Sequence, residues 1–287
     1  MQSIAGRFIK EEFYLVNGFS RQWIYKKRRS LFRKEIIESD IVDKVKEIRV
    51  KHRRMGSRVM YFRLNIENVG INKFENIVSK NGLTVKTKKR RIVTTNGQYE
   101  KSDINKINGL ELCRINQVIA GDITYLIIKN KTYYIFTLKD MYSKRIIGLY
   151  GSDNLRAINA KIALQQAIKL RGSGIKNCIH HSDAGSQYKS SLYKKLLNNN
   201  NIEMSIAQNC LENGMAEQLN GVLKNDYLFN EVKNVKDLNR QLQEIKRLIN
   251  EERPVKALQY RTPVEFEQYL KESTNMRKIR LYDFTNI

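Results

Sequence analysis

Three consecutive segments decide the fold of this chain: VIAGDITYLIIK at residues 118–129, TYYIFTLKDM at 132–141 and KRIIGLYG at 144–151. The first two are rich in the β-branched and aromatic residues that favour strands. A short Asn-Lys turn and a Tyr-Ser turn separate the three segments. We therefore predict three strands that follow one another directly along the chain.

Helical and strand-like segments alternate after this point. Helices are predicted at 156–170, 190–197 and 213–228, and short strands at 176–183 and 203–206. In the first of these helices we expect the buried positions to be Ile158, Ile162, Ala163 and Ile168. The order of three strands, helix, strand, helix, strand and helix is that of an α/β ribonuclease-H-like fold, a mixed sheet flanked by helices.

The residues before this core predict a small basic region that is all helical. Helices are expected at about 41–50, 59–64 and 72–81, with Ser39-Asp40 as N-cap and Gly56 able to end the first helix. The predicted organisation is a basic arm at 1–38, a helix-turn-helix-like DNA-binding region at 39–83, a basic linker at 84–111, the catalytic core at 112–270 and a tail at 271–287. A purely structural three-helix spacer is the alternative for the second region. Trp23 and Tyr25 are expected to pack in the core.

Composition excludes several classes of protein. No apolar run approaches the length of a membrane span, and the N-terminus lacks the unbroken apolar stretch of a signal peptide. The three cysteines, Cys113, Cys178 and Cys210, are far apart and odd in number, which argues against a disulfide framework. We expect buried or half-buried thiols in a reducing compartment.

The net charge indicates the partner. It is +24, and residues 1–110 carry 26 basic and 11 acidic side chains, a net charge of +15. Such an excess is costly in a compact state unless a polyanion neutralises it, and double-stranded DNA is the favoured polyanion, ahead of a membrane surface. The candidate DNA-binding side chains are Arg21, Lys26, Lys27, Arg28, Arg29, Arg53, Arg54, Arg58, Lys88, Lys89, Arg90 and Arg91.

Three acidic residues stand out by their positions. Asp122 lies inside an apolar strand, Asp183 follows a predicted strand, and Glu217 lies in a predicted helix. If they converge, they can hold two divalent cations about 3.5–4 Å apart, an arrangement that promotes attack on phosphorus. Taken singly, Asp122 is explained by pairing with a lysine, Asp183 by an Asx turn and Glu217 by a helix surface. Their order in so basic a chain favours the metal site.

Lys224 follows Glu217 by seven residues, or two helical turns, so both side chains are predicted on one helix face. Beside a metal-binding carboxylate, a lysine can hold the DNA backbone next to the cleaved bond. An ordinary exposed lysine is an equal alternative on spacing alone.

Several motifs together resemble one family. They are GDITY at 121–125, LKDMYSKRIIG at 138–148, HHSDAGSQY at 180–188, NGMAEQLNGVLK at 213–224 and RPVKALQYRTPVEF at 253–266. The chain is similar over nearly its whole length to the second-frame transposases of the insertion-sequence-three family, which belong to the DDE superfamily with a core like that of retroviral integrases.

The resemblance implies that Asp122, Asp183 and Glu217 are the catalytic and metal-binding triad and that Lys224 contacts DNA. It implies two Mg²⁺ ions, with Mn²⁺ as a substitute. The positions Asn213, His181, Ser186, Gln187 and Tyr188 match family motifs and are expected to shape the site without binding metal.

The expected function is that of a DNA transposase, a polynucleotidyl transferase that cleaves at the ends of an insertion element and joins the freed 3′-hydroxyl to target DNA. Expected partners are element ends, target DNA, at least one further copy of the chain and a separate upstream-frame helix-turn-helix protein. The expected location is the bacterial cytoplasm, with the nucleoid. The alternatives are an integrase-fold nuclease that cuts without joining, and a catalytically silent DNA-binding relative with a regulatory or domesticated role.

Overall fold

The computed structural model describes residues 16, 18–85, 105–207, 214–228, 231–272 and 279–280. At residues 21, 214–217 and 279–280 it describes only the backbone. The chain divides into two compact units, one of residues 1–50 with 56–85 and the other of residues 51–55 with 86–287. Within the described parts, no helix is both long and apolar enough to cross a membrane.

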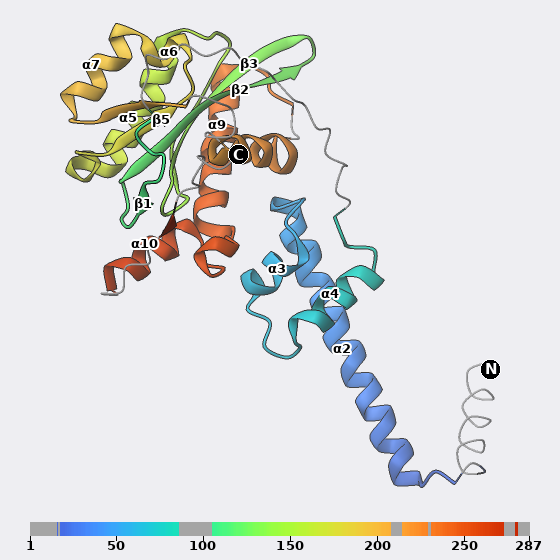
Figure 1. The fold of residues 1–287 in the computed structure, drawn as a ribbon. Coiled ribbons are helices and arrows are strands. Elements are labelled where there is room, and N and C mark those ends of the chain that lie inside the picture. Colours follow the sequence, from blue (N-terminus) through green and yellow to red (C-terminus); the bar gives the residue numbers. More distant parts are fainter. Residues whose placement is uncertain are drawn as a thin grey trace. The chain divides into compact units, whose positions relative to one another are not determined.

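A long helix dominates the first unit (Figure 1). Helix α2 (Arg21–Lys51) has 31 residues and begins where Ser20 Oγ accepts a hydrogen bond from the backbone N–H of Trp23 at 3.1 Å. The helix start predicted at Ser39-Asp40 is therefore wrong, and the boundary predicted between residues 38 and 39 lies inside α2. The physical reason is that residues 21–51 contain no glycine or proline that would end a helix earlier.

Two short helices complete this unit. They are α3 (Ser57–Leu64) and α4 (Ile71–Lys80), close to the predicted bounds. Their connection, residues 65–70, is longer than the 3–4-residue turn that is typical of a helix-turn-helix motif. The buried side chains of the unit include Ile41, Val45, Met60, Phe74 and Val78. Trp23 and Tyr25 do not join a core, since 38% and 58% of their surfaces are exposed, so that expectation is wrong.

The second unit contains a five-stranded sheet in the order β4-β3-β2-β5-β6. The strands are β2 (Val118–Ile128), β3 (Lys131–Asp140), β4 (Ile146–Ser152), β5 (Ile179–Ser182) and β6 (Glu203–Ile206). Strands β2, β3 and β4 run antiparallel to one another, whereas β5 pairs parallel with both β2 and β6. The prediction of a mixed sheet is confirmed.

Helices cover both faces of this sheet (Figure 1). One face is covered by α5 (Ala157–Arg171), η1 (Gly172–Ile175), α6 (Ser186–Lys189) and α7 (Ser191–Asn199), of which η1 and α6 have only four residues each. On the other lie α8 (Gly214–Val222), the π-helical turn η3 (Leu223–Tyr227), α9 (Val235–Arg247) and a second π-helical turn η4 (Leu248–Glu252). Leu219 from α8 and Leu242 from α9 share a buried cluster with Ile135 of β3.

The C-terminal part closes the unit. After η5 (Lys256–Leu258), α10 (Pro263–Glu272) starts with a capping box, in which the Thr262 hydroxyl and the Glu265 carboxylate accept hydrogen bonds from each other's backbone N–H. Phe266 of α10 packs in a third buried cluster with Ala120 and Met141. Strand β7 (Ile279–Arg280), in the predicted tail, pairs antiparallel with β1 (Glu111–Leu112). The β1–β7 pair thus lies at the two ends of the predicted core, 112–270.

Helix α5 lies unusually close to the sheet. Its buried side chains are small ones, including Ala160, Ala163 and Ala167, and a Cβ added to Gly148 of β4 would collide with the carbonyl oxygen of Ala163. Burial of Ala163 confirms one predicted position. Ile168 is half-buried and packs against the same buried cluster as Ala163, and Ile162 is half-buried. Ile158 is 42% exposed, so that prediction is wrong, because the face that meets the sheet is centred on the alanines.

Candidate active site

Asp122 and Asp183 occupy equivalent places on neighbouring strands. Strand β2 pairs in parallel with β5 up to the partners Ala120 and His181, and each aspartate lies two residues beyond this last pair that the two strands share. Neighbouring strands are about 4.8 Å apart, and residues at equal offsets on parallel strands share one face. Both carboxylates also raise the pKa of Tyr188, after the larger effect of its burial. Two of the predicted acids therefore come from corresponding positions near the same end of neighbouring strands.

The carboxylate of Asp122 is held by two hydrogen bonds. Its Oδ1 accepts from the backbone N–H of Ile123 at 2.9 Å, and its Oδ2 accepts from Asn220 Nδ2 at 2.6 Å. Asn220 belongs to α8, one helical turn after Glu217. The helix that carries the third predicted acid is thus fastened directly to the first.

Asn220 is a site residue that the sequence analysis missed. Its side chain is buried, and its Oδ1 has no hydrogen-bond partner among the described residues. Burial of a carboxamide oxygen without a hydrogen-bond partner is costly in free energy unless a bound group serves as that partner. A signal was present in the sequence, because asparagine is disfavoured inside a helix and this one lies three residues after the candidate Glu217.

The described side chains supply only part of the predicted triad. Glu217 lies on the backbone of α8, but its side chain is outside the described residues. Consistently, no group of three or more His, Cys, Asp or Glu side chains suitable for a metal occurs among those that are described. The meeting of all three carboxylates stays a prediction.

The donor set present fits a hard divalent cation. Asp183 is exposed, and its Oδ1 accepts a hydrogen bond from Gly185 N–H at 3.2 Å, which is the Asx turn expected as an alternative. That turn engages one oxygen of Asp183, and each oxygen of Asp122 accepts a hydrogen bond. Carboxylate oxygens of this kind are the ligands that Mg²⁺ prefers, and the unsatisfied Oδ1 of Asn220 belongs to the carboxamide that donates to Asp122. The residues therefore fit such an ion.

Lys224 lies on the π-helical turn η3 rather than on a regular helix. Its Nζ is 4.6 Å from the centre of the Tyr125 ring. Partial burial lowers the pKa of Lys224, and the negative charge of Asp122 acts in the opposite direction. The charge of Asp122 thus acts on Lys224, whereas the prediction that Lys224 and Glu217 share one helix face stays a prediction, because the Glu217 side chain lies outside the described residues.

The residues expected to shape the site fall into different environments. His181 is buried and its Nδ1 is 2.9 Å from Ser205 Oγ. Gln187 donates to the carbonyl of Leu155 at 3.0 Å, Tyr188 is buried, and Ser186 begins α6. Asn213 lies outside the described residues.

His180, the neighbour of His181, packs on the opposite side of β5. Its Nε2 is 2.8 Å from the hydroxyl of Tyr193, and burial lowers its pKa to about 3, so it is neutral at physiological pH. A Cβ on Gly121 would lie 2.8 Å from His180 Nε2. Any larger side chain at position 121 would therefore collide with the ring of His180, so the residue before Asp122 must be glycine.

The predicted DNA-binding residues are dispersed. Lys26, Lys27, Arg28 and Arg29 are exposed on α2, where Tyr25, Phe32 and Ile36 are exposed as well. Arg58 forms an ion pair with Glu75 at 3.0 Å. The backbone of Arg21 opens α2, and Arg53 and Arg54 follow that helix, whereas Lys88, Lys89, Arg90 and Arg91 lie outside the described residues. Their contacts with DNA stay a prediction.

Comparison with known families identifies the second unit. Two sequence families, both described as integrase core domain, match residues 114–209 and 199–263. A putative transposase of insertion sequence element IS150 from Escherichia coli K12 is 24% identical over 235 residues, which are 79% of this chain and 83% of the relative.

Other matching relatives are transposases of further insertion sequences. A putative transposase of IS986/IS6110 from Mycobacterium tuberculosis is 24% identical over 68% of this chain and 74% of the relative. The transposase InsF of IS3A from Escherichia coli K12 is 34% identical over 40% of this chain and 41% of the relative. Among solved structures, the HTLV-2 integrase catalytic core domain in complex with magnesium has a TM-score of 0.44 and 18% identity, and the match covers 53% of this chain and 95% of that one. The resemblance drawn from the motifs is confirmed.

Proposed function

Because residues 114–263 form an integrase core domain like that of insertion-sequence-three transposases, we propose that this chain is a DNA transposase that cuts at element ends and joins them to target DNA through Asp122, Asp183 and Glu217. One observation carries the proposal. Asp122 and Asp183 each lie two residues beyond the last pair shared by the parallel strands β2 and β5, and Asn220 ties the helix of Glu217 to Asp122.

The three carboxylates would hold Mg²⁺, two ions in the full proposal, with Mn²⁺ as a substitute. When bound, such ions stabilise the charge that develops on the attacking and leaving oxygens of a phosphodiester. Asp122 is held in one orientation by Ile123 N–H and Asn220, so little rearrangement is needed when substrate arrives. Asp183, on an exposed turn, can adjust to the strand that is bound.

The proposed reaction consists of two displacements at phosphorus. In cleavage, the oxygen of a water molecule bonds to phosphorus, the bond from phosphorus to the 3′-oxygen breaks, and that oxygen leaves as a hydroxyl. In joining, the oxygen of the freed 3′-hydroxyl bonds to a phosphorus of target DNA and loses its proton to solvent. The bond from that phosphorus to the target strand's own 3′-oxygen breaks, and this oxygen takes a proton from solvent and leaves as a hydroxyl. Lys224 would hold the backbone phosphate beside the reacting one.

DNA would be held mainly by charge. Exposed basic residues of α2, among them Lys26 and Arg28, would lie along phosphates, and the net charge of +24 favours the same partner. We further propose that at least two copies act on DNA, since two element ends are processed together, and that a helix-turn-helix protein from an upstream frame is a partner. A reaction on chromosomal DNA places the protein in the bacterial cytoplasm, with the nucleoid.

Two alternatives have different outcomes in the same assay. A nuclease of this fold would cut without joining, and a silent DNA-binding relative would do neither. Retention of Asp122, Asp183 and Glu217 together supports an active enzyme.

The test is cleavage and joining of labelled DNA that carries the element ends, with Mg²⁺ or with EDTA. We expect wild type to form both products only with the metal, and Glu217→Gln to bind DNA but form neither. Binding without any product in Mg²⁺ or Mn²⁺, even when the upstream-frame protein is added, would contradict the proposal in favour of the silent relative.

A further inference from the structure

Tyr125 is an exposed aromatic residue three positions after Asp122. It lies in the middle of β2, yet 58% of its surface is exposed. Ile127, the next residue on the same face of the strand, is 62% exposed. An aromatic and an aliphatic side chain therefore form a short apolar strip beside the proposed site, where a strand interior would normally be covered.

The position of this strip follows from the sheet. Strand β5 pairs with β2 only at Val118–Ala120, so among the described residues the edge of β2 beyond Ala120 has no strand beside it on that side. Asp183 lies just past the end of β5, at the beginning of the same open edge. A nucleic-acid strand that reaches the carboxylates can continue along this edge without displacing another strand.

Lys224 links the ring of Tyr125 to the site. Alternation along β2 puts Tyr125 on the face opposite Asp122, whereas Lys224 comes from the helical segment that covers the Asp122 face. Its ammonium nevertheless lies 4.6 Å from the centre of the Tyr125 ring, so the two meet around the open edge of β2. A cation over an aromatic ring in partly exposed surroundings is held only weakly. A phosphate can therefore draw the ammonium away.

Tyr125 and Lys224 together offer one binding group for each part of a nucleotide, a ring for the base and a cation for the phosphate. A phosphate attracts the ammonium of Lys224, and the flat face of the Tyr125 ring accepts any base by stacking. We propose that Tyr125 is the stacking platform for a nucleobase of the DNA strand held at Asp122 and Asp183, and that Lys224 moves from the ring to a backbone phosphate when DNA binds. This inference rests on the proposed function and names a specific contact of that site.

The test measures binding without cleavage. The full chain in EDTA is titrated with a duplex whose 3′-strand has a short unpaired end containing a fluorescent adenine analogue that is quenched by stacking. Wild type and Tyr125→Phe should quench it and bind equally well. Tyr125→Leu, which keeps apolar bulk but has no ring, should lose the quenching and bind about tenfold more weakly, as expected for one base stacked on an aromatic ring.

Two controls separate stacking from charge. Lys224→Ala should keep the quenching but reduce the slope of log affinity against log salt by about 0.7–0.9, the effect of one phosphate contact. Tyr269→Leu removes another ring with a cation over it, that of Arg261 at 4.3 Å, and should change nothing. Tyr125→Leu with wild-type affinity and quenching would overturn the inference and leave the proposed function intact. Absence of salt-dependent binding by wild type would instead overturn the proposed function.

Discussion

At the scale of single residues, Asp122 shows how a carboxylate is maintained in an apolar strand. Both of its oxygens accept hydrogen bonds, and one donor, Asn220, belongs to a different element. A hydrogen bond to an ionised group is stronger than one between neutral groups, so Asn220 also favours the charged form that a metal needs. The hydrogen bond from Asn220 therefore both fixes helix α8 to strand β2 and stabilises the ionised carboxylate of Asp122.

Asn220→Ala should lower the rate of Mg²⁺-dependent cleavage about 10–100-fold, which is usual when a partner that orients a metal-binding side chain is removed. The Mg²⁺ concentration for half-maximal rate should rise, because Asp122 loses the bond from Asn220 Nδ2. Cleavage rates measured against Mg²⁺ concentration check both effects.

Asn220→Asp distinguishes orientation from packing. It preserves side-chain volume but replaces the donor to Asp122 with a second negative charge, so the rate of cleavage should fall at least as far as in Asn220→Ala. Asn225→Ala, which removes only a hydrogen bond to the carbonyl of Gly221, should behave as wild type. If Asn220→Ala matched Asn225→Ala, the role given to Asn220 would be wrong.

At the scale of elements, β4 is an edge strand whose backbone is covered by side chains. Asn250 donates to the carbonyl of Ile146 and accepts from its N–H, both at 2.9 Å, and Asn239 makes the same pair of bonds with Gly151. Gln243 and Lys246 donate to carbonyls between these points. One face of the helical segment from α9 into η4 thus replaces the missing neighbouring strand, which closes the edge to pairing with other chains.

Asn250→Ala should lower the free energy of unfolding by about 2–4 kcal/mol, since it leaves two buried backbone groups without a partner at about 1–3 kcal/mol each. Urea unfolding of the full chain measures the change. Asn198→Ala, on the exposed surface of α7, is the control and should alter stability little. Equal stabilities of the two variants would show that water replaces the Asn250 side chain at no cost.

The elements differ in how well the sequence predicts them. Strands β2, β3 and β4 follow from their long apolar, β-branched runs, and the structure places each within two residues of the prediction at both ends. The start of α2 did not follow, because Arg21–Lys34 is basic and aromatic without helical periodicity. The π-helical turn at η3 could not be predicted, since its residues suit an α-helix equally well and tertiary packing selects the wider turn.

The residues of the candidate site also differ in how well the sequence predicts them. Asp122 and Asp183 were found because an acid within or just after an apolar strand is unusual, and the parallel register places both near the same end of β2 and β5. Tyr125 was missed because its contact with Lys224 joins two elements and no local pattern contains it. Asn220 was missed although an asparagine inside the helix of Glu217 was a local signal, because only the structure shows that it donates to Asp122.

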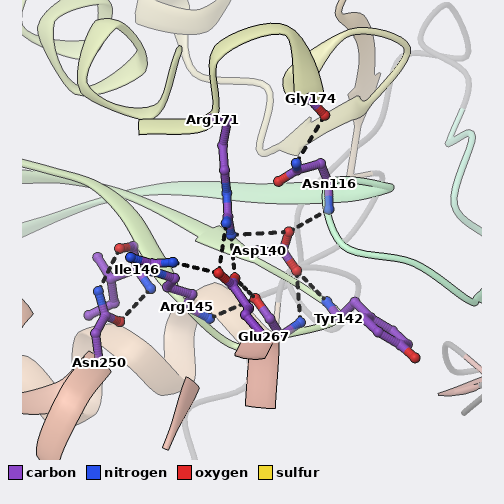
Figure 2. A network of polar contacts seen from close by, with 10 residues as sticks. Asn116, Asp140, Tyr142, Arg145, Ile146, Arg171, Gly174, Asn250 and Glu267 are labelled. Carbon is purple, nitrogen blue, oxygen red and sulfur yellow. Dashed lines mark hydrogen bonds and ion pairs between the residues drawn. The ribbon is translucent and has the colours of Figure 1, made fainter. Parts of the chain in front are cut away.

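At the scale of the whole molecule, a buried network of charges joins parts that are distant in sequence. Figure 2 shows Glu267 of α10 bound by Arg171 of α5 and by Arg145, with Asp140 at the end of β3 beside Arg171. Ser143 Oγ also donates to Glu267 at 2.7 Å. Buried charges of this kind are costly to separate, so the network fixes α10 to the core.

Stability should depend on pH through Glu267. Burial acts to raise its pKa, but hydrogen bonds and the charge of Arg171 outweigh burial and hold the pKa below its ordinary value of 4.5. The stabilisation is therefore fully present above pH 4.5 and is lost as pH falls through the lowered pKa. Asp140, whose pKa is raised by burial, acts in the opposite direction.

Glu267→Gln should cost about 3–5 kcal/mol of unfolding free energy at neutral pH, the range for one lost partner of a buried ion pair. The difference from wild type should shrink as the pH falls below 4.5. Unfolding curves recorded across this range test the claim, with Glu272→Gln, an exposed acid of the same helix, as control. A difference that does not vary with pH would show that packing rather than charge is responsible.

The central claim is that Asp122, Asp183 and Glu217 act as one metal-dependent unit. The most direct measurement is the Mg²⁺-dependent rate of strand cleavage for wild type, Asp122→Asn, Glu217→Gln and the double variant, with DNA binding measured in parallel. Residues that act as a unit have non-additive effects. We therefore predict that each single variant loses cleavage and keeps DNA binding, and that the double variant is no worse than either. A Glu217→Gln variant that cleaves at the wild-type rate, or losses that multiply in the double variant, would contradict the account.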